Sequence, residues 1–125
     1  MQSQVNKKEK YQKMNPIKGE VPVLLGEETY TCRLTIDALC QIEDALDKGI
    51  IEIVTDLTQA KTRISWLITI LHHALKGGGN NFDEKKVKEI IINTGVAVAT
   101  VEVAKMLAAS LSAEEDEEVK KNQEK

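Results

Sequence analysis

The two histidines of this chain, His72 and His73, are adjacent, and a run of three glycines, residues 77–79, follows them. Paired histidines can bind a metal, and glycine-rich loops can cradle phosphate. Neighbouring residues on a helix diverge by about 100°, so these imidazoles do not share one ion as an i,i+4 pair does. The glycines follow a predicted helix and have no Lys-Ser/Thr after them. We therefore predict a flexible loop that ends a helix, with no metal and no phosphate bound.

Acidic side chains are a second candidate for chemistry. Glu43 and Asp47 are spaced i,i+4 on a predicted helix, and such pairs can serve acid–base or magnesium chemistry. They lie opposite the apolar positions of that helix, so we predict an ordinary solvated face. No serine stands in a glycine elbow or beside a base. The sequence thus predicts no catalytic residue and no cofactor, and an enzyme is a distant alternative.

The composition limits the class of protein. A chain of 125 residues suits one domain. Hydrophobic residues are 42% and aromatics 3%, so aliphatic side chains must fill the core. The net charge of −3 gives no general attraction to nucleic acid. The two cysteines, Cys32 and Cys40, are too few for a disulfide framework and indicate reduced thiols in a cytosolic protein. No signal peptide and no membrane span are visible.

Charge gathers at the two ends of the chain. The first 18 residues are rich in lysine, and the last 14 are rich in glutamate and aspartate. Both ends are poor in apolar residues. We predict a basic flexible arm over residues 1–14, a single domain over 15–111, and a charged flexible tail over 112–125. The arm leaves open a contact with an acidic or nucleic-acid partner, although lysines without arginine are a weak sign of nucleic-acid binding.

The elements that follow the arm begin with a β-hairpin. Apolar residues alternate over 21–25 and again over 30–34, around a turn at Gly26–Glu28. Pro22 lacks an N–H group, so it indicates an edge strand or the start of a strand. Helical periodicity then recurs to residue 111, with Thr35 and Asn81 or Asp83 as N-caps and Gly49 and Gly95 as stops. We predict an α+β, mainly α fold, with an N-terminal β-hairpin followed by about five helices in a compact bundle. The predicted helices cover residues 35–48, 50–57, 62–76, 83–94 and 96–111. The β-branched residues over 50–57 and 96–103 leave a strand open as an alternative for these two segments.

Two of these helices are apolar on more than one side. Ile64, Leu67 and Leu71 lie on one side of the helix over 62–76, and a second side carries further large residues. The helix over 96–111 repeats this pattern. A helix that is apolar all round is either buried or in contact with something else, and both outcomes stay open here. The second sides supply our candidate contacts for a partner or for self-association, namely Trp66, Ile70, His73, Val98 and Val101.

The order of segments resembles the small tail assembly chaperones of phages and gene transfer agents. The resemblance spans roughly residues 15–111 and includes "LHHAL" and "FDEKKVKEIIINTG". As in that family, the chain has, in this order, a basic-Gly-Glu-Val strand, a glycine turn, a tyrosine-bearing strand and a threonine-capped helix. The matching positions are Lys18, Gly19, Glu20, Gly26, Tyr30, Thr35, Ala38, Leu39, Ile42, Glu43, Leu46 and Gly49.

This resemblance implies a non-enzymatic helper of tail assembly. It implies binding to the long, helical tape-measure protein in the cytoplasm of a bacterial host, and absence from the mature particle. The family has no catalytic residues to transfer. Two alternatives remain: a structural tail or neck component that stays in the particle, and a small helical adaptor whose lysine-rich arm touches nucleic acid.

Overall fold

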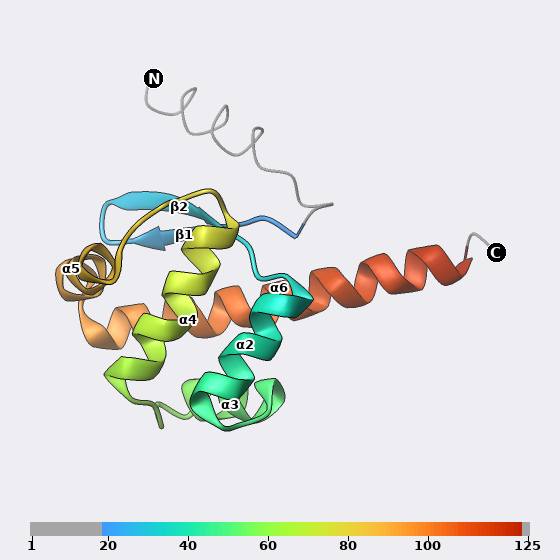
Figure 1. Cartoon of the computed structure of the whole chain (residues 1–125), viewed down its shortest axis with the longest axis horizontal. Helices are drawn as coiled ribbons and strands as arrows, with labels where there is room; N and C mark the ends of the chain where they lie inside the picture. The colour runs from blue at the N-terminus through green and yellow to red at the C-terminus, as the bar shows by residue number, and fades with distance from the viewer. Residues whose placement is uncertain (1–18, 124–125) are drawn as a thin grey trace, which may run out of the picture.

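The computed structural model describes residues 19–123, with side chains as far as residue 112. The described part is an antiparallel pair of strands followed by five helices (Figure 1), which confirms the predicted fold class. The predicted basic arm, residues 1–14, lies outside it. The elements are β1 (Val21–Leu25), β2 (Glu28–Cys32), α2 (Ile36–Leu46), α3 (Ile50–Thr58), α4 (Ile64–Gly77), α5 (Glu84–Thr94) and α6 (Val96–Gln123).

The hairpin has the predicted position, but its loop is shorter than the predicted turn at Gly26–Glu28, since Glu28 already belongs to β2. Leu25 pairs with Glu28, so only two residues form the loop, and the first of them, Gly26, has a φ of 71°. A glycine at the first central position with positive φ matches the type II′ turns that join twisted strands. Alternation points Val23 and Leu25 inward, where both are buried. The inner face of the hairpin thus closes one end of the helical core.

Helix α4 is the centre of the molecule. It contacts α2, α5, α6 and β2, and it passes through the middle of the bundle in Figure 1. Because neighbours surround it, its buried positions form a broad arc and not a single stripe. These positions are Leu67, Ile70, Leu71, Ala74 and Leu75.

The first two glycines of the run at the end of α4, Gly77 and Gly78, are packed, which corrects the predicted flexible loop at these positions. A methyl group on Gly77 would overlap the carbonyl oxygen of Arg33, and one on Gly78 would overlap that of Thr31. The Arg33 amide donates to the Ala74 carbonyl over 2.9 Å, and the Asn80 side-chain amide donates to the Thr31 carbonyl over 2.8 Å. The glycines therefore let the backbone of α4 lie directly against the chain at the end of β2.

The junction between α2 and α3 corrects two predictions. Thr35 caps α2 as expected, accepting from the Ala38 amide over 3.1 Å. However, α2 ends at Leu46, and its C-cap residue Asp47 has a left-handed φ of 55°. Gly49 is the N-cap of α3 instead of a C-terminal glycine of α2. Glu43 accepts a hydrogen bond from the Ile50 amide over 2.7 Å. Its carboxylate therefore caps α3, where a solvated face was predicted.

Helices α5 and α6 follow the predicted starts. Asp83 caps α5, accepting from the Lys86 amide over 2.8 Å, and Gly95, with a φ of 95°, separates α5 from α6. Helix α6 then continues to Gln123, past the body of the molecule (Figure 1), so the segment from residue 112, predicted as a flexible tail, is helical as far as Gln123. Ala, Glu, Lys and Gln favour helix even where no apolar face requires one.

No single helix of the described residues is long and apolar enough to cross a membrane, although α5 and the first part of α6, bent by 111° at their junction, pass the length and composition criteria as a pair.

Candidate functional site

The outer side of α6 presents two of the predicted contact residues to solvent. Val98 is 53% exposed and Val101 is 52% exposed. Val101 lies on the rim of a hollow of about 350 Å³ between α3 and α6, with Leu57, Thr58, Ala104, Lys105 and Ala108. The exposure agrees with the predicted second side of this helix, and its use by a partner stays a prediction.

A second hollow lies between α4, α5 and the start of α6, and we call it the isoleucine hollow. It measures about 310 Å³. Ile64 is 55% exposed, Ile92 74% and Val96 41%, and these values are high for large aliphatic side chains. Lys88 is the one charged residue of its lining, which consists of Ile64, Ile68, Lys88, Ile91, Ile92 and Val96.

Sequence reasoning missed the isoleucine hollow. Ile64 had been placed on one apolar side of its helix together with Leu67 and Leu71, and Ile92 had been given no role. A signal was available in the three consecutive isoleucines that end with Ile92. Successive residues on a helix point about 100° apart, so Ile90 and Ile91 can both be buried only if Ile92 faces outward. The structure has this arrangement, with Ile90 and Ile91 buried.

The three candidates on α4 do not form one surface. Ile70 is completely buried, so its assignment as a partner contact is wrong. Other elements of the bundle cover the side of α4 that carries Ile70. The spacing of apolar residues along one helix could not show this. Trp66 is partly buried against the core, and His73 is half-buried.

The two histidines have different surroundings. A nitrogen of the His72 ring lies 3.0 Å from the Phe82 carbonyl oxygen, which ties α4 to the segment before α5. Burial lowers the pKa of His73, and the neighbouring His72 and Lys76 lower it further. His73 is therefore set up to stay neutral in the folded chain, as a packed imidazole would.

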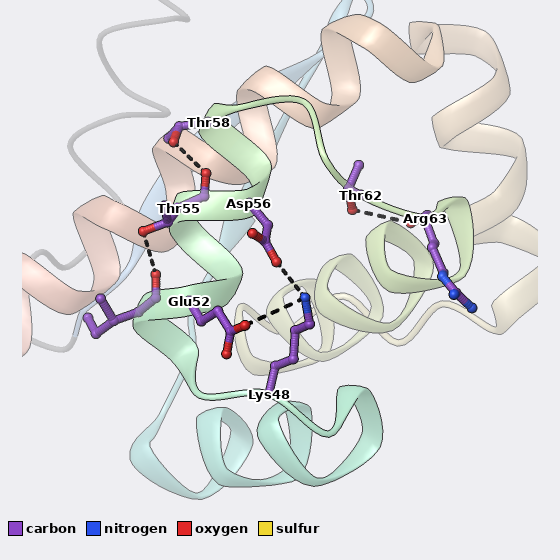
Figure 2. A network of polar contacts seen from close by, with 8 residues as sticks. Lys48, Glu52, Thr55, Asp56, Thr58, Thr62 and Arg63 are labelled. Carbon is purple, nitrogen blue, oxygen red and sulfur yellow. Dashed lines mark hydrogen bonds and ion pairs between the residues drawn. The ribbon is translucent and has the colours of Figure 1, made fainter.

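A third hollow, which we call the tryptophan hollow, joins α3 to the start of α4. It measures about 330 Å³. Lys48 donates to Asp56 over 2.7 Å and lies 3.7 Å from Glu52, as Figure 2 shows. The hydrogen bond to Asp56 raises the pKa of Lys48 despite opposing desolvation, and both carboxylates add to the rise. The lining consists of Lys48, Asp56, Ala60, Lys61, Thr62, Arg63 and Trp66.

The aromatic ring in this hollow lies beside two cations. The Lys48 ammonium nitrogen is 4.9 Å from the centroid of the Trp66 ring, and the Arg63 guanidinium carbon is 6.0 Å from it. Both distances fall in the range of cation–π attraction. Sequence reasoning had singled out Trp66 for its position on an apolar stripe, and its cationic neighbours come from the α2–α3 junction and from the residue before α4.

The remaining reactive groups are dispersed. Cys32 is buried, and desolvation raises the pKa of its thiol to about 12, whereas Cys40 is exposed, and both are free. Within residues 19–112, no three His, Cys, Asp or Glu side chains lie close enough together to hold a metal ion. The described surface includes two apolar hollows, one charged aromatic hollow and a more polar hollow beside the hairpin turn, and such hollows are suited to binding.

Comparison with known sequences places the chain in a family. Residues 18–113 match the family described as "Phage tail tube protein, GTA-gp10", where GTA denotes gene transfer agent. The chain belongs to this family and is therefore related to the tails of phages and gene transfer agents, with a structural or assembly role in the tail. No curated protein and no solved structure matches the chain.

Proposed function

We propose that the chain is a tail assembly chaperone that binds the tape-measure protein while the tail of a phage, prophage or gene transfer agent forms. In this role it has no enzymatic activity, works in the cytoplasm of the bacterial host and is absent from the finished particle. The family membership supports a tail role. The step from tail role to chaperone is ours, and it draws on the resemblance of the segment order and on the surface of the helices.

The observation that carries the proposal is the isoleucine hollow. Two of its side chains, Ile64 and Ile92, are more than half exposed, and both belong to one concave lining that is apolar except for Lys88. Burying a large aliphatic side chain completely contributes about 1.5–3 kcal/mol. A concave apolar surface between helices accepts the apolar side of an amphipathic helix. The tape-measure protein, which the resemblance implies is long and helical, supplies such helices.

The proposal is tested by co-expressing the tagged chain with the tape-measure protein encoded near it and recovering the tagged chain. We expect the tape-measure protein to become soluble and to co-purify. Ile92→Asp should reduce its recovery about tenfold or more, because a carboxylate cannot be desolvated in the hollow. Ile51→Asp is the matched control, since Ile51 is 68% exposed and lies outside the lining of the isoleucine hollow.

The outcomes of this experiment separate function from location. Far-ultraviolet circular dichroism first shows that both variants fold. Recovery that is lost with Ile51→Asp and kept with Ile92→Asp would move the binding surface away from the isoleucine hollow. Failure of the unsubstituted chain to recover any tape-measure protein would contradict the chaperone function itself.

The second candidate is a structural component of the tail tube. The observation in its favour is the description of the family, which names a tail tube protein. A tube component stays in the particle, whereas a chaperone leaves it. Quantitative mass spectrometry of purified particles and of the cells that produce them distinguishes the two, since a tube subunit would be present in many copies per particle and self-associate in solution.

A further inference from the structure

We propose that the tryptophan hollow is a second binding site, selective for an acidic segment of a protein partner. It takes carboxylate side chains on Lys61 and Arg63, beside the face of Trp66. The site differs from the isoleucine hollow in lining and chemistry, so the inference does not rest on the chaperone function.

The first support is an excess of positive charge. Three cations line the hollow, and one of them, Lys48, is already matched by Asp56 and Glu52. Within the described part of the chain, neither Lys61 nor Arg63 has a carboxylate within ion-pair distance. Figure 2 shows the Arg63 side chain directed away from the Lys48 network. Two unmatched cations therefore remain in a chain whose net charge is −3.

The second support is the way the chain holds these cations. Ala60 has a φ of 58°, which an alanine rarely adopts, and Lys61 follows it directly. The Lys61 amide donates to the Asp56 carbonyl over 2.7 Å. A strained residue that is held by its surroundings places the next side chains in a fixed direction. The conformation thus presents Lys61 and Thr62 on the same hollow as Trp66.

The third support is the start of α4. Arg63 is its N-cap residue, and the Arg63 side chain makes no capping hydrogen bond. The positive end of the helix dipole therefore adds to the charge of the two cations. A guanidinium with a free edge binds a carboxylate through two parallel hydrogen bonds, which is the geometry an acidic side chain offers.

The chemistry favours an acidic peptide over a nucleic acid. Counting Lys48, Lys61 and Arg63 against Asp56 and Glu52 leaves an excess of one positive charge. Nucleic-acid binding draws most of its affinity from many phosphate contacts, which so small an excess does not provide. A short run of carboxylates needs only the two free cations, and the aromatic face of Trp66 accepts the methylene groups between them.

The test uses the full chain and an acetylated hexaglutamate amide as the probe. Trp66 is the only tryptophan, so its fluorescence reports on this hollow alone. We expect saturable binding by calorimetry, a matching change in Trp66 emission, and weakening as sodium chloride is raised. Lys61→Gln with Arg63→Gln should weaken binding about tenfold. Lys76→Gln with Lys85→Gln removes the same charge elsewhere on exposed lysines and should change it less than about twofold.

Several results would overturn the inference. Absence of calorimetric binding would do so, and so would binding without a change in Trp66 emission, because the peptide would then lie elsewhere. Equal weakening by both double variants would reduce the effect to overall charge. Tighter binding of a single-stranded oligonucleotide or of inorganic phosphate, lost in the Lys61/Arg63 variant, would assign the hollow to phosphate instead of to acidic peptide.

Discussion

The contact between the glycine run and β2 makes a sharp prediction about stability. Gly78→Ala places a methyl group against the Thr31 carbonyl oxygen and close to the backbone of Cys32. Neither is the end of a flexible side chain, so the overlap is relieved only if the end of α4 moves away from β2. That movement would disturb α4 along its length, including the residues that line the isoleucine and tryptophan hollows.

The size of the effect follows from what the movement breaks. Overpacking of a tight site costs about 1–3 kcal/mol. The hydrogen bonds from Arg33 to Ala74 and from Asn80 to Thr31 cross the same contact, and each contributes about 1 kcal/mol. We therefore expect Gly78→Ala to lower the free energy of unfolding by about 3–5 kcal/mol, a large part of the 5–15 kcal/mol typical of a domain.

The assay is urea unfolding followed by Trp66 fluorescence and by circular dichroism at 222 nm. Gly49→Ala is the control, because Gly49 has an ordinary φ and a methyl group there meets only a Glu43 oxygen at 3.8 Å. We expect the control to stay within about 1 kcal/mol of the unsubstituted chain. A Gly78→Ala variant as stable as this control would refute the close approach of α4 to β2.

Three further predictions concern single residues. A thiol reagent at pH 8 should label Cys40 in the folded chain, and Cys32 only after unfolding, because Cys32 is buried and its pKa is raised to about 12; rapid labelling of both would contradict its burial. The pKa of His73 is lowered from 6.5, so the unfolded chain binds the proton more tightly. The folded chain therefore loses stability as the pH falls below 6.5, where the unfolded chain takes up the proton and the folded chain resists it. The urea midpoint of the unsubstituted chain should drop more between pH 7 and pH 5 than that of His73→Gln. Ala60→Gly should stabilise the chain by about 0.5–1 kcal/mol in the same assay, since glycine tolerates a φ of 58°; a loss of stability would mean that Ala60 is not strained.

Much of the fold could be predicted because its signals are local. Alternating apolar residues fixed the faces of the hairpin, and Val23 and Leu25 are buried as the period of two requires. The Thr35 and Asp83 caps each bond an amide three residues ahead. Such contacts depend on neighbouring residues alone, so the sequence shows them directly.

The features that the sequence did not show depend on contacts between elements. Glu43 caps a helix seven residues further on, which required the turn at Asp47 to be known. The glycine run predicted mobility, whereas Gly77 and Gly78 lie against the backbone at the end of β2 and of the residue that follows it, Arg33. Ile70 was assigned to the surface because no pattern within one helix shows which of its sides a neighbouring helix covers.

The candidate site was predicted only in part, because part of it depends on one helix and part on contacts between helices. Val98 and Val101 are exposed as their stripe indicated, because α6 packs on the body along one side and leaves the other open. The isoleucine hollow combines residues from three helices. Each of its apolar residues is ordinary within its own helix. They form a candidate binding surface only because the fold brings the three helices together.

The most direct test of the chaperone function is site-specific photo-crosslinking in cells that are assembling tails. A photoreactive amino acid would replace Ile92, in the isoleucine hollow, or Ile51, at a comparably exposed position outside it. We expect position 92 to form an adduct that mass spectrometry identifies as the tape-measure protein, and position 51 to form none. Adducts of position 92 with further copies of this chain, persisting in finished particles, would contradict the chaperone function and support a tube component.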